Sequence, residues 1–137
     1  MTSTLVDSNV LIDVLKMEPP WWDWSRLRLM EAANAGEVVI NQIVLAESAM
    51  RFHDSEAFAA LDIAEFTREN LPWESSFRAG QAHRAYRDRG GLRERTLPDF
   101  LIGAHAEAKG HRLLTRDPRR YRAYFPTIEI IAPDTHP

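Results

Sequence analysis

Thr4-Leu5-Val6-Asp7-Ser8-Asn9-Val10-Leu11-Ile12-Asp13 is the stretch that decides the fold. The apolar pair Leu5-Val6 stops at a carboxylate, and apolar residues then recur with helical spacing from Val10 onward. We interpret the stretch as a buried strand that runs into a helix, with Asp7 at the carboxyl end of the strand. Ligands bind at that end of the strands in open parallel sheets, so the position suits chemistry. A helix cap formed by Asp7 or Ser8 is the simpler alternative.

Length and composition indicate one globular domain. The chain has 137 residues, of which 45% are hydrophobic, so we expect a single domain over residues 1–137. No apolar run approaches the roughly 20 residues that span a bilayer, and the N-terminus reaches Asp7 too early for a signal peptide. The chain has no cysteine, so any metal would be held by oxygen or histidine. We therefore expect a cytoplasmic protein that does not bind membranes.

The net charge of −3 conceals an uneven distribution. Residues 1–77 carry 5 basic and 13 acidic side chains, whereas residues 78–125 carry 12 basic and 5 acidic ones. All the basic residues except Lys16 and Lys109 are arginines, which form bidentate contacts with phosphate. The basic half suits a polyanionic partner, but the solvated surface of a protein encoded by GC-rich DNA would have the same composition.

Strands and helices alternate along the rest of the chain. Short apolar runs predict strands at residues 37–40, 111–115 and 128–131, with a short edge strand at residues 69–72. Helical patterns lie between them, at residues 21–35, 43–52, 55–66, 74–89 and 97–109. This alternation predicts an α/β fold in which helices cover both faces of a parallel sheet.

Three acidic residues later in the chain each have a local structural explanation. Asp117 follows an apolar strand but precedes a proline, where a helix cap or an Asx turn is common. Glu47 lies at the edge of the apolar arc of its helix, in i,i+4 spacing with Arg51. Asp99 lies in the first turn of its helix and forms with Thr96 the pattern of a capping box.

The acids taken together predict metal-dependent phosphodiester hydrolysis. If the strands that end at Asp7 and Asp117 are neighbours, all four carboxylates can meet in one pocket. Four like charges would raise one another's pKa values and destabilise the fold unless a cation lay among them. Carboxylates suit Mg²⁺ or Mn²⁺, and such an ion holds a phosphodiester oxygen and lowers the pKa of an attacking water. Asn9 and Thr115 are placed to orient a carboxylate or a water by hydrogen bonding.

These residues resemble the PIN-domain family in order and spacing over nearly the whole chain. The resemblance rests on Asp7-Ser8-Asn9-Val10-Leu11-Ile12, Glu47, Pro98-Asp99-Phe100-Leu101-Ile102-Gly103-Ala104-His105-Ala106 and Leu113-Leu114-Thr115-Arg116-Asp117. The length and the ending, Tyr121-x-x-Tyr-Phe-Pro and then Ile128-x-Ile-Ile-Ala-Pro, are similar to the VapC toxins of bacterial type II toxin–antitoxin pairs. Phe100 and Gly103 replace residues that are more often aliphatic or alanine in the family, which we interpret as packing variation.

The resemblance implies a five-stranded parallel sheet of order 3-2-1-4-5 in an α/β/α sandwich. It implies an endoribonuclease dependent on Mg²⁺ (or Mn²⁺), a homodimer, and a cognate antitoxin whose tail covers the active site. By position, Asn9 and Thr115 would support the acidic quartet that holds the metal, which consists of Asp7, Glu47, Asp99 and Asp117. We further predict that RNA is contacted by arginines of the basic half, namely Arg84, Arg87, Arg93, Arg95 and Arg116.

Two other functions remain open on the sequence. A phosphatase that forms an aspartyl-phosphate would need Asp-x-Asp after the first strand, and the second position here is Asn9. A catalytically silent binding module would use the basic half and an exposed patch at Trp21, Trp22 and Trp24, facing an antitoxin or a second copy; ordinary packing is the alternative for these tryptophans. Four histidines show no metal-ligand spacing, so we expect surface or packing roles for His53, His83, His105 and His111.

Overall fold

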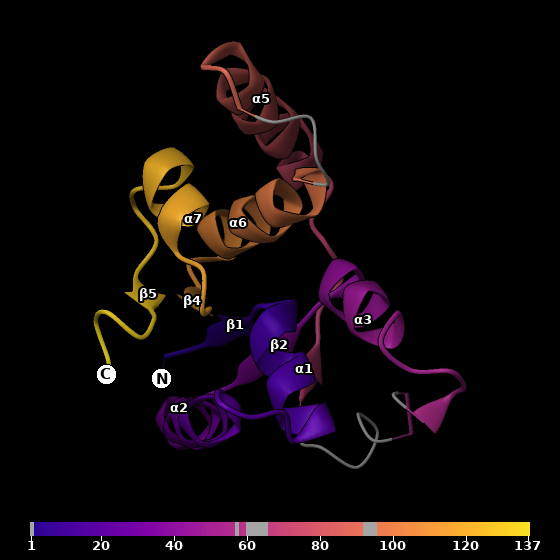
Figure 1. The fold of residues 1–137 in the computed structure, drawn as a ribbon. Helices are drawn as coiled ribbons and strands as arrows, with labels where there is room; N and C mark the ends of the chain where they lie inside the picture. The colour runs from indigo at the N-terminus through magenta and orange to yellow at the C-terminus, as the bar shows by residue number, and fades with distance from the viewer. Residues whose placement is uncertain (1, 57, 60–65, 92–95) are drawn as a thin grey trace.

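The computed structural model describes residues 2–56, 58, 59, 66–91 and 96–137. These residues form one sheet of five parallel strands, β1 (Thr4–Val6), β2 (Val38–Ile40), β3 (Thr67–Arg68), β4 (Arg112–Leu114) and β5 (Ile130–Ile131). Their order across the sheet is β3-β2-β1-β4-β5, so the predicted order is confirmed (Figure 1). β1 lies at the centre, and the residues that follow β1 and β4 are neighbours at the carboxyl edge.

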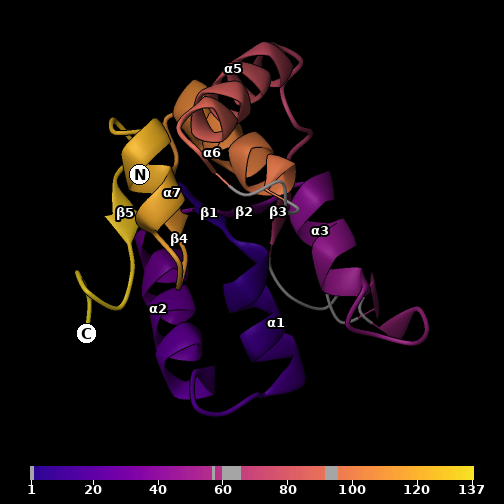
Figure 2. The ribbon, with the colours of Figure 1, turned by 45° about the horizontal axis from the view of Figure 1, so that its top comes forward.

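Helices cover both faces of the sheet and complete the predicted α/β/α sandwich. α1 (Ser8–Lys16) and α2 (Trp22–Ala35) lie on one face, and α5 (Glu74–Asp88) and α6 (Leu97–Lys109) lie on the other (Figure 1, Figure 2). α3 (Gln42–Ala49) contacts both α1 and α6, and α7 (Arg119–Tyr124) packs against α6. The chain changes face between β3 and β4, as right-handed crossovers require when the strand order turns back past β1.

The central strands are buried on both faces, which explains their continuous apolar runs. Leu5 of β1 pairs with Val39 on one side and with Leu113 on the other. All three side chains are fully buried, as expected for a parallel sheet that is covered on both faces. The backbone from which Asp7 and Thr115 emerge is therefore held by the core of the molecule.

Two predicted elements need comment. The edge strand expected at residues 69–72 is wrong in position, since β3 is Thr67–Arg68. By Leu71 the backbone no longer pairs with β2: the N–H of this residue donates to the side chain of Gln42 at 3.0 Å instead. The helix expected at residues 55–66 lies mostly outside the described residues. In the part of the chain that the structure describes, no helix has the length and apolar character needed to cross a membrane.

The two departures from the family pattern on α6 belong to one aromatic cluster. Phe100 lies with its ring centroid 5.6 Å from that of Tyr86, 5.4 Å from that of Tyr124 and 6.2 Å from that of Phe125. A Cβ added at Gly103 would come within 2.5 Å of the Phe125 ring. The missing side chain at position 103 thus makes room for a large ring at position 125, in agreement with packing variation.

Candidate acidic active site

Asp7 joins β1 to α1 with a carboxylate that is only 4% exposed. Its Oδ1 accepts a hydrogen bond from the N–H of Ser8 at 2.8 Å, so the residue does cap the helix, as the simpler alternative proposed. Its Oδ2 also accepts from the hydroxyls of Thr115 at 2.8 Å and Tyr121 at 3.0 Å. A helix cap does not need these two bonds. They hold the carboxylate in one orientation at the edge of the sheet.

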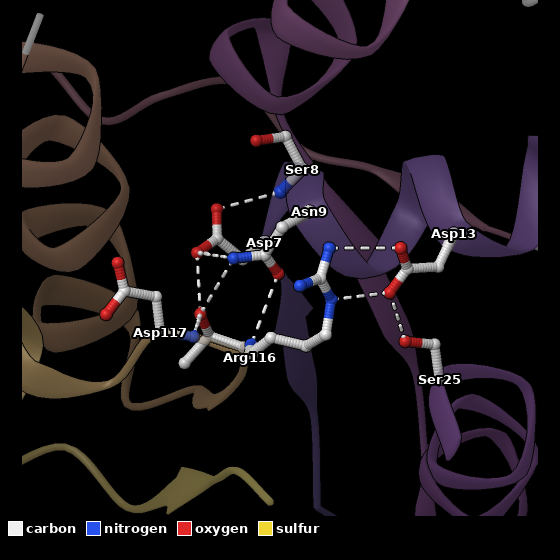
Figure 3. A network of polar contacts seen from close by, with 8 residues as sticks. Asp7, Ser8, Asn9, Asp13, Ser25, Arg116 and Asp117 are labelled. Atoms are coloured by element: carbon white, nitrogen blue, oxygen red, sulfur yellow. Dashed lines mark hydrogen bonds and ion pairs between the residues drawn. The ribbon is translucent and has the colours of Figure 1, made fainter. Parts of the chain in front are cut away.

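Thr115 and Asn9, the two predicted supporting residues, link the ends of the central strands. The Thr115 hydroxyl donates to Asp7 and accepts from the N–H of Asp117 at 3.1 Å. The Nδ2 of Asn9 lies 3.4 Å from Thr115 Oγ1, and its Oδ1 accepts from the backbone N–H of Arg116 at 3.2 Å. Figure 3 shows Asp7, Asn9 and Asp117 gathered where these strands end. The supporting residues therefore orient the backbone that carries both aspartates.

Glu47 reaches from α3 toward the start of α1. Its Oε1 accepts from the hydroxyl of Ser8 at 3.0 Å, which places it beside Asp7. The alternative pairing with Arg51 is wrong, because the Arg51 guanidinium donates to Glu18 at 2.6 Å. Ser8 therefore tethers one acid with its hydroxyl and the other with its backbone N–H.

Asp99 lies in the first turn of α6 and is paired across to α7. Arg120 donates from Nη1 to its Oδ2 at 2.7 Å. The capping-box alternative is wrong, because the Thr96 side chain makes no capping bond and its buried hydroxyl has no hydrogen-bond partner among the described residues. Asp117 is exposed, and no donor within the described ranges contacts its carboxylate.

The charges of neighbouring acids contribute to the raised pKa values of Asp7, Glu47 and Asp99, so these groups lie close enough to interact. Burial raises the pKa of Asp7 against the hydrogen bonds that it accepts, and the charge of Glu47 raises it further. Burial also raises the pKa of Glu47, with a contribution from the charge of Asp99. Burial and then the charge of Asp7 raise the pKa of Asp99 to about 6, and Asp117 acts in the same direction. The four acids of the predicted quartet therefore lie within electrostatic reach of one another at this edge of the sheet, and their shared role as a site stays a prediction.

Three further side chains of this region, Tyr121, Arg120 and Asp13, were not predicted from the sequence. Tyr121 stays protonated because burial, and then the nearby carboxylates, raise its pKa well above its usual value. It is therefore a permanent donor to Asp7. Arg120 is the counter-ion of Asp99, and no sequence pattern marks it among the other arginines. Asp13 had a signal, since it lies one helical turn after Asn9 on α1.

Arg116 has a different role from the one predicted. Its guanidinium forms a bidentate pair with Asp13, at 2.6 and 3.0 Å, and Asp13 also accepts from the hydroxyl of Ser25 at 2.6 Å (Figure 3). Asp13 is only 2% exposed, and the guanidinium lies over the ring of Trp21. Arg116 therefore fastens the loop after β4 to α1 and is not free for the RNA contact predicted from the sequence.

The other predicted RNA-binding arginines lie on α5 or outside the described residues. Arg84 and Arg87 are exposed on α5 and line an open hollow of about 390 Å³ together with His83. Arg93 and Arg95 fall in a stretch that the structure does not describe. RNA contact by these four arginines stays a prediction.

The tryptophans at positions 21, 22 and 24 pack against the protein. All three are partly buried, and the Nε1 of Trp24 donates to the carbonyl of His136 at 2.6 Å. Trp21 contacts Trp24 edge to face, with ring centroids 6.0 Å apart. The most exposed large aromatic side chains among the described residues are instead Trp73 and Phe77 at the start of α5, which are 91% and 75% exposed.

A comparison with known protein families accounts for this arrangement of strand-end acids. The sequence profile of the PIN domain matches residues 4–126, a range that contains all four carboxylates. The chain belongs to the PIN-domain family. Among curated proteins, none matches it by sequence.

Solved structures share the fold over almost the whole of this PIN domain. VapBC2 from Rickettsia felis, bound to a DNA fragment from its promoter, has a TM-score of 0.74 at 20% identity, with 96% of this chain and 98% of that chain covered. VapBC-1 from nontypeable Haemophilus influenzae gives 0.72 at 14% identity with the same coverage. A toxin–antitoxin complex from Klebsiella pneumoniae gives 0.63 at 22% identity, covering 93% and 95%. At these identities the likeness concerns the fold.

The donor set of this PIN domain fits a hard divalent cation. Among the described residues, Arg120 is the one cationic side chain that contacts any of the four acids. The neighbouring Arg116 pairs with Asp13 instead. Carboxylate oxygens are the ligands that Mg²⁺ and Mn²⁺ prefer, and positive charge among them would relieve the repulsion between the acids. The residues that would hold the ion are Asp7, Glu47, Asp99 and Asp117.

Glu69, His105 and His111 of the PIN domain form a second polar cluster. His105 and His111 therefore make specific hydrogen bonds in addition to the packing expected of them. The Oε1 of Glu69 lies 2.7 Å from the Nε2 atoms of both His105 and His111. Asn41 fixes the tautomer of His105: its Oδ1 accepts from the N–H of Val44, so its Nδ2 donates to His105 Nδ1 at 2.8 Å. His105 Nε2 then carries the proton and donates to Glu69, which leaves it without a lone pair for a metal. We interpret this partly buried cluster as a hydrogen-bond network that joins the end of β3 to α6 and the start of β4, rather than as a metal site.

Proposed function

We propose that this PIN domain is an endoribonuclease dependent on Mg²⁺ or Mn²⁺ and that it acts as the toxin of a toxin–antitoxin pair. The observation that carries the proposal is the convergence of four carboxylates, with one arginine to balance them, at the carboxyl edge of the sheet. Asp7, Glu47, Asp99 and Asp117 would hold the ion. When bound, it supplies positive charge for a phosphodiester oxygen and lowers the pKa of water.

The protein's own side chains prepare the site in different ways. Three donors hold Asp7 in a fixed orientation, which reduces the reorganisation that binding requires. Without a cation, burial and the charge of Asp7 raise the pKa of Asp99 to about 6, so positive charge at the site would favour its ionised form. Asp117 is exposed, so the site opens to solvent on its side. An RNA strand would approach from there.

The proposal includes protein partners. The Klebsiella pneumoniae neighbour is a toxin–antitoxin complex, and the Rickettsia felis and Haemophilus influenzae neighbours are VapBC structures, which supports a cognate antitoxin for this chain. Trp73 and Phe77 lie four residues apart and are largely exposed, and such aromatic pairs are favoured at interfaces. We assign them to a homodimer. An RNA substrate and an antitoxin together imply a cytoplasmic site of action.

Cleavage of structured RNA by the purified, antitoxin-free protein tests the proposal. We expect cleavage with Mg²⁺ or Mn²⁺, none in EDTA, and a loss of more than about 100-fold in Asp7→Asn. Asparagine still caps a helix, so this variant keeps its fold. Asp23→Asn is the control, because the Asp23 side chain is 82% exposed. Robust cleavage by Asp7→Asn, or cleavage in EDTA, would contradict the proposal. If the protein binds RNA but neither cleaves it nor binds Mn²⁺, the result would instead favour a catalytically silent module.

A further inference from the structure

Arg120 occupies an unusual position for a structural arginine. Its Nη1 contacts Asp99 at 2.7 Å, and the side chains of the pair are 34% and 27% exposed. Asp99 is also one of the carboxylates that would hold a divalent cation. A guanidinium and a metal ion therefore compete for the same carboxylate, of which Arg120 holds Oδ2.

The surroundings of Arg120 allow its guanidinium to leave Asp99. The group lies over the ring of Tyr86, 5.5 Å from the centroid, and Tyr86 is itself packed against Phe100 and Tyr124. This cation–π contact does not involve Asp99, so it persists when the carboxylate takes another partner. The contrast is Arg116, which is held by a bidentate contact to an almost fully buried aspartate.

We propose that Arg120 exchanges partners when the site is filled: the divalent cation takes Asp99, and the released guanidinium pairs with the phosphodiester of the RNA. The inference rests on the proposed function and adds a substrate-positioning residue to it. A guanidinium presents a planar fork that matches two phosphate oxygens. Arg120 already lies at the acids around which that phosphodiester has to be held.

Two consequences distinguish this exchange from a purely structural ion pair. Without RNA, Arg120 weakens cation binding, because its positive charge lies at Asp99 and it occupies Oδ2. With RNA, Arg120 strengthens substrate binding. If the ion pair only joined α7 to α6, its loss would leave Asp99 less well positioned. Cation binding would then become weaker, not stronger.

The experiment compares Arg120→Gln and Arg120→Lys with the wild type. Mn²⁺ affinity is measured by titration calorimetry without RNA, and KM for RNA cleavage is measured at saturating Mn²⁺. We expect Arg120→Gln to bind Mn²⁺ about five- to tenfold more tightly and to have a KM about tenfold higher. Arg120→Lys keeps the charge without the fork, so both changes should be smaller and in the same direction. Arg122→Gln is the matched control, because Arg122 lies on the same helix and is paired with Asp134.

Each result decides the inference. Unchanged or weaker Mn²⁺ binding in Arg120→Gln would overturn the exchange and leave the ribonuclease proposal intact. Tighter Mn²⁺ binding with an unchanged KM would overturn the phosphate contact. A wild type that binds no Mn²⁺ at millimolar concentration would overturn both this inference and the proposed function. If Arg120→Gln does not fold, Arg120→Lys decides by the same two directions.

Discussion

Asp7 and Asp117 follow neighbouring strands, yet their carboxylates differ in burial and in hydrogen bonding. Asp7 is buried and accepts bonds from Ser8, Thr115 and Tyr121, whereas Asp117 is exposed and has no donor among the described residues. In the proposed cation site, the fixed buried carboxylate would set the position of the ion and the exposed one would leave it open to further ligands.

At this scale, Tyr121→Phe tests how strongly Asp7 depends on its donors. The variant keeps the ring and removes the O–H that donates at 3.0 Å. Hydrogen bonds to charged groups are worth about 1.5–3 kcal/mol, so we expect Mn²⁺ to bind about tenfold more weakly at pH 7 in calorimetric titration. Tyr124→Phe is the control, since the Tyr124 hydroxyl has no hydrogen bond with the described residues. Equal affinities in the two variants would contradict this role of Tyr121.

A second residue-scale prediction concerns the pH dependence of stability. Burial and the charge of Asp7 raise the pKa of Asp99 from 3.8 to about 6. The stabilisation from the protonated form is fully present below pH 3.8 and is lost as the pH rises through 6. In EDTA at pH 7.5, Asp99→Asn should therefore be more stable than the wild type by about 1–3 kcal/mol, and the difference should vanish near pH 4. Urea unfolding at several pH values measures it. A variant less stable at pH 7.5 would show that the Arg120 pair outweighs burial.

Among the elements, α6 carries an acid of the quartet and also packs tightly against Phe125. Asp99 lies in its first turn, and one turn later Gly103 lies under the ring of Phe125. The path of α6 over the sheet, and so the position of Asp99, depends on that contact.

Gly103→Ala should therefore be destabilising. A Cβ at this position would lie 2.5 Å from the Phe125 ring, and overpacking of this kind costs about 1–3 kcal/mol. Gly80→Ala, in α5, is the matched control, because a Cβ there meets nothing within 4 Å. It should stabilise the protein by about 0.5–1 kcal/mol. Thermal unfolding of both variants measures the contrast, and similar melting temperatures would contradict it.

The elements also show what sequence patterns can and cannot predict. The strands that precede Asp7 and Asp117 were predictable, because buried parallel strands are short apolar runs. Their order came from the resemblance to the PIN-domain family. β3 was misplaced, since its two residues are too few to form a pattern. The pairing of Arg120 with Asp99 and of Arg116 with Asp13 was not predictable. Each of many arginines could reach several acids, and only the packing of α7 and α1 decides among them.

For the whole molecule, the exposed aromatic side chains point to association. The tryptophans near position 22 are partly buried, whereas Trp73 and Phe77 expose most of their surface at the start of α5. α5 lies on the outer side of the layer that covers one face of the sheet (Figure 1). This surface is therefore free for the proposed homodimer.

The double variant Trp73→Ala/Phe77→Ala should be monomeric at concentrations where the wild type is a dimer. Truncating two central aromatic side chains removes the residue types that dominate interface energies. Light scattering after size-exclusion chromatography measures the mass. Met30→Ser is the control, because Met30 is 52% exposed on α2, across the sheet. A monomeric wild type, or a double variant that remains dimeric, would contradict the assignment of this surface.

The central claim is that acids from four separate parts of the chain form one cation site. The most direct measurement is the anomalous difference density of crystals grown with Mn²⁺. We predict a peak among the carboxylates of Asp7, Glu47, Asp99 and Asp117. A peak at the cluster of Glu69, His105 and His111 instead, or no peak at saturating Mn²⁺, would contradict this prediction.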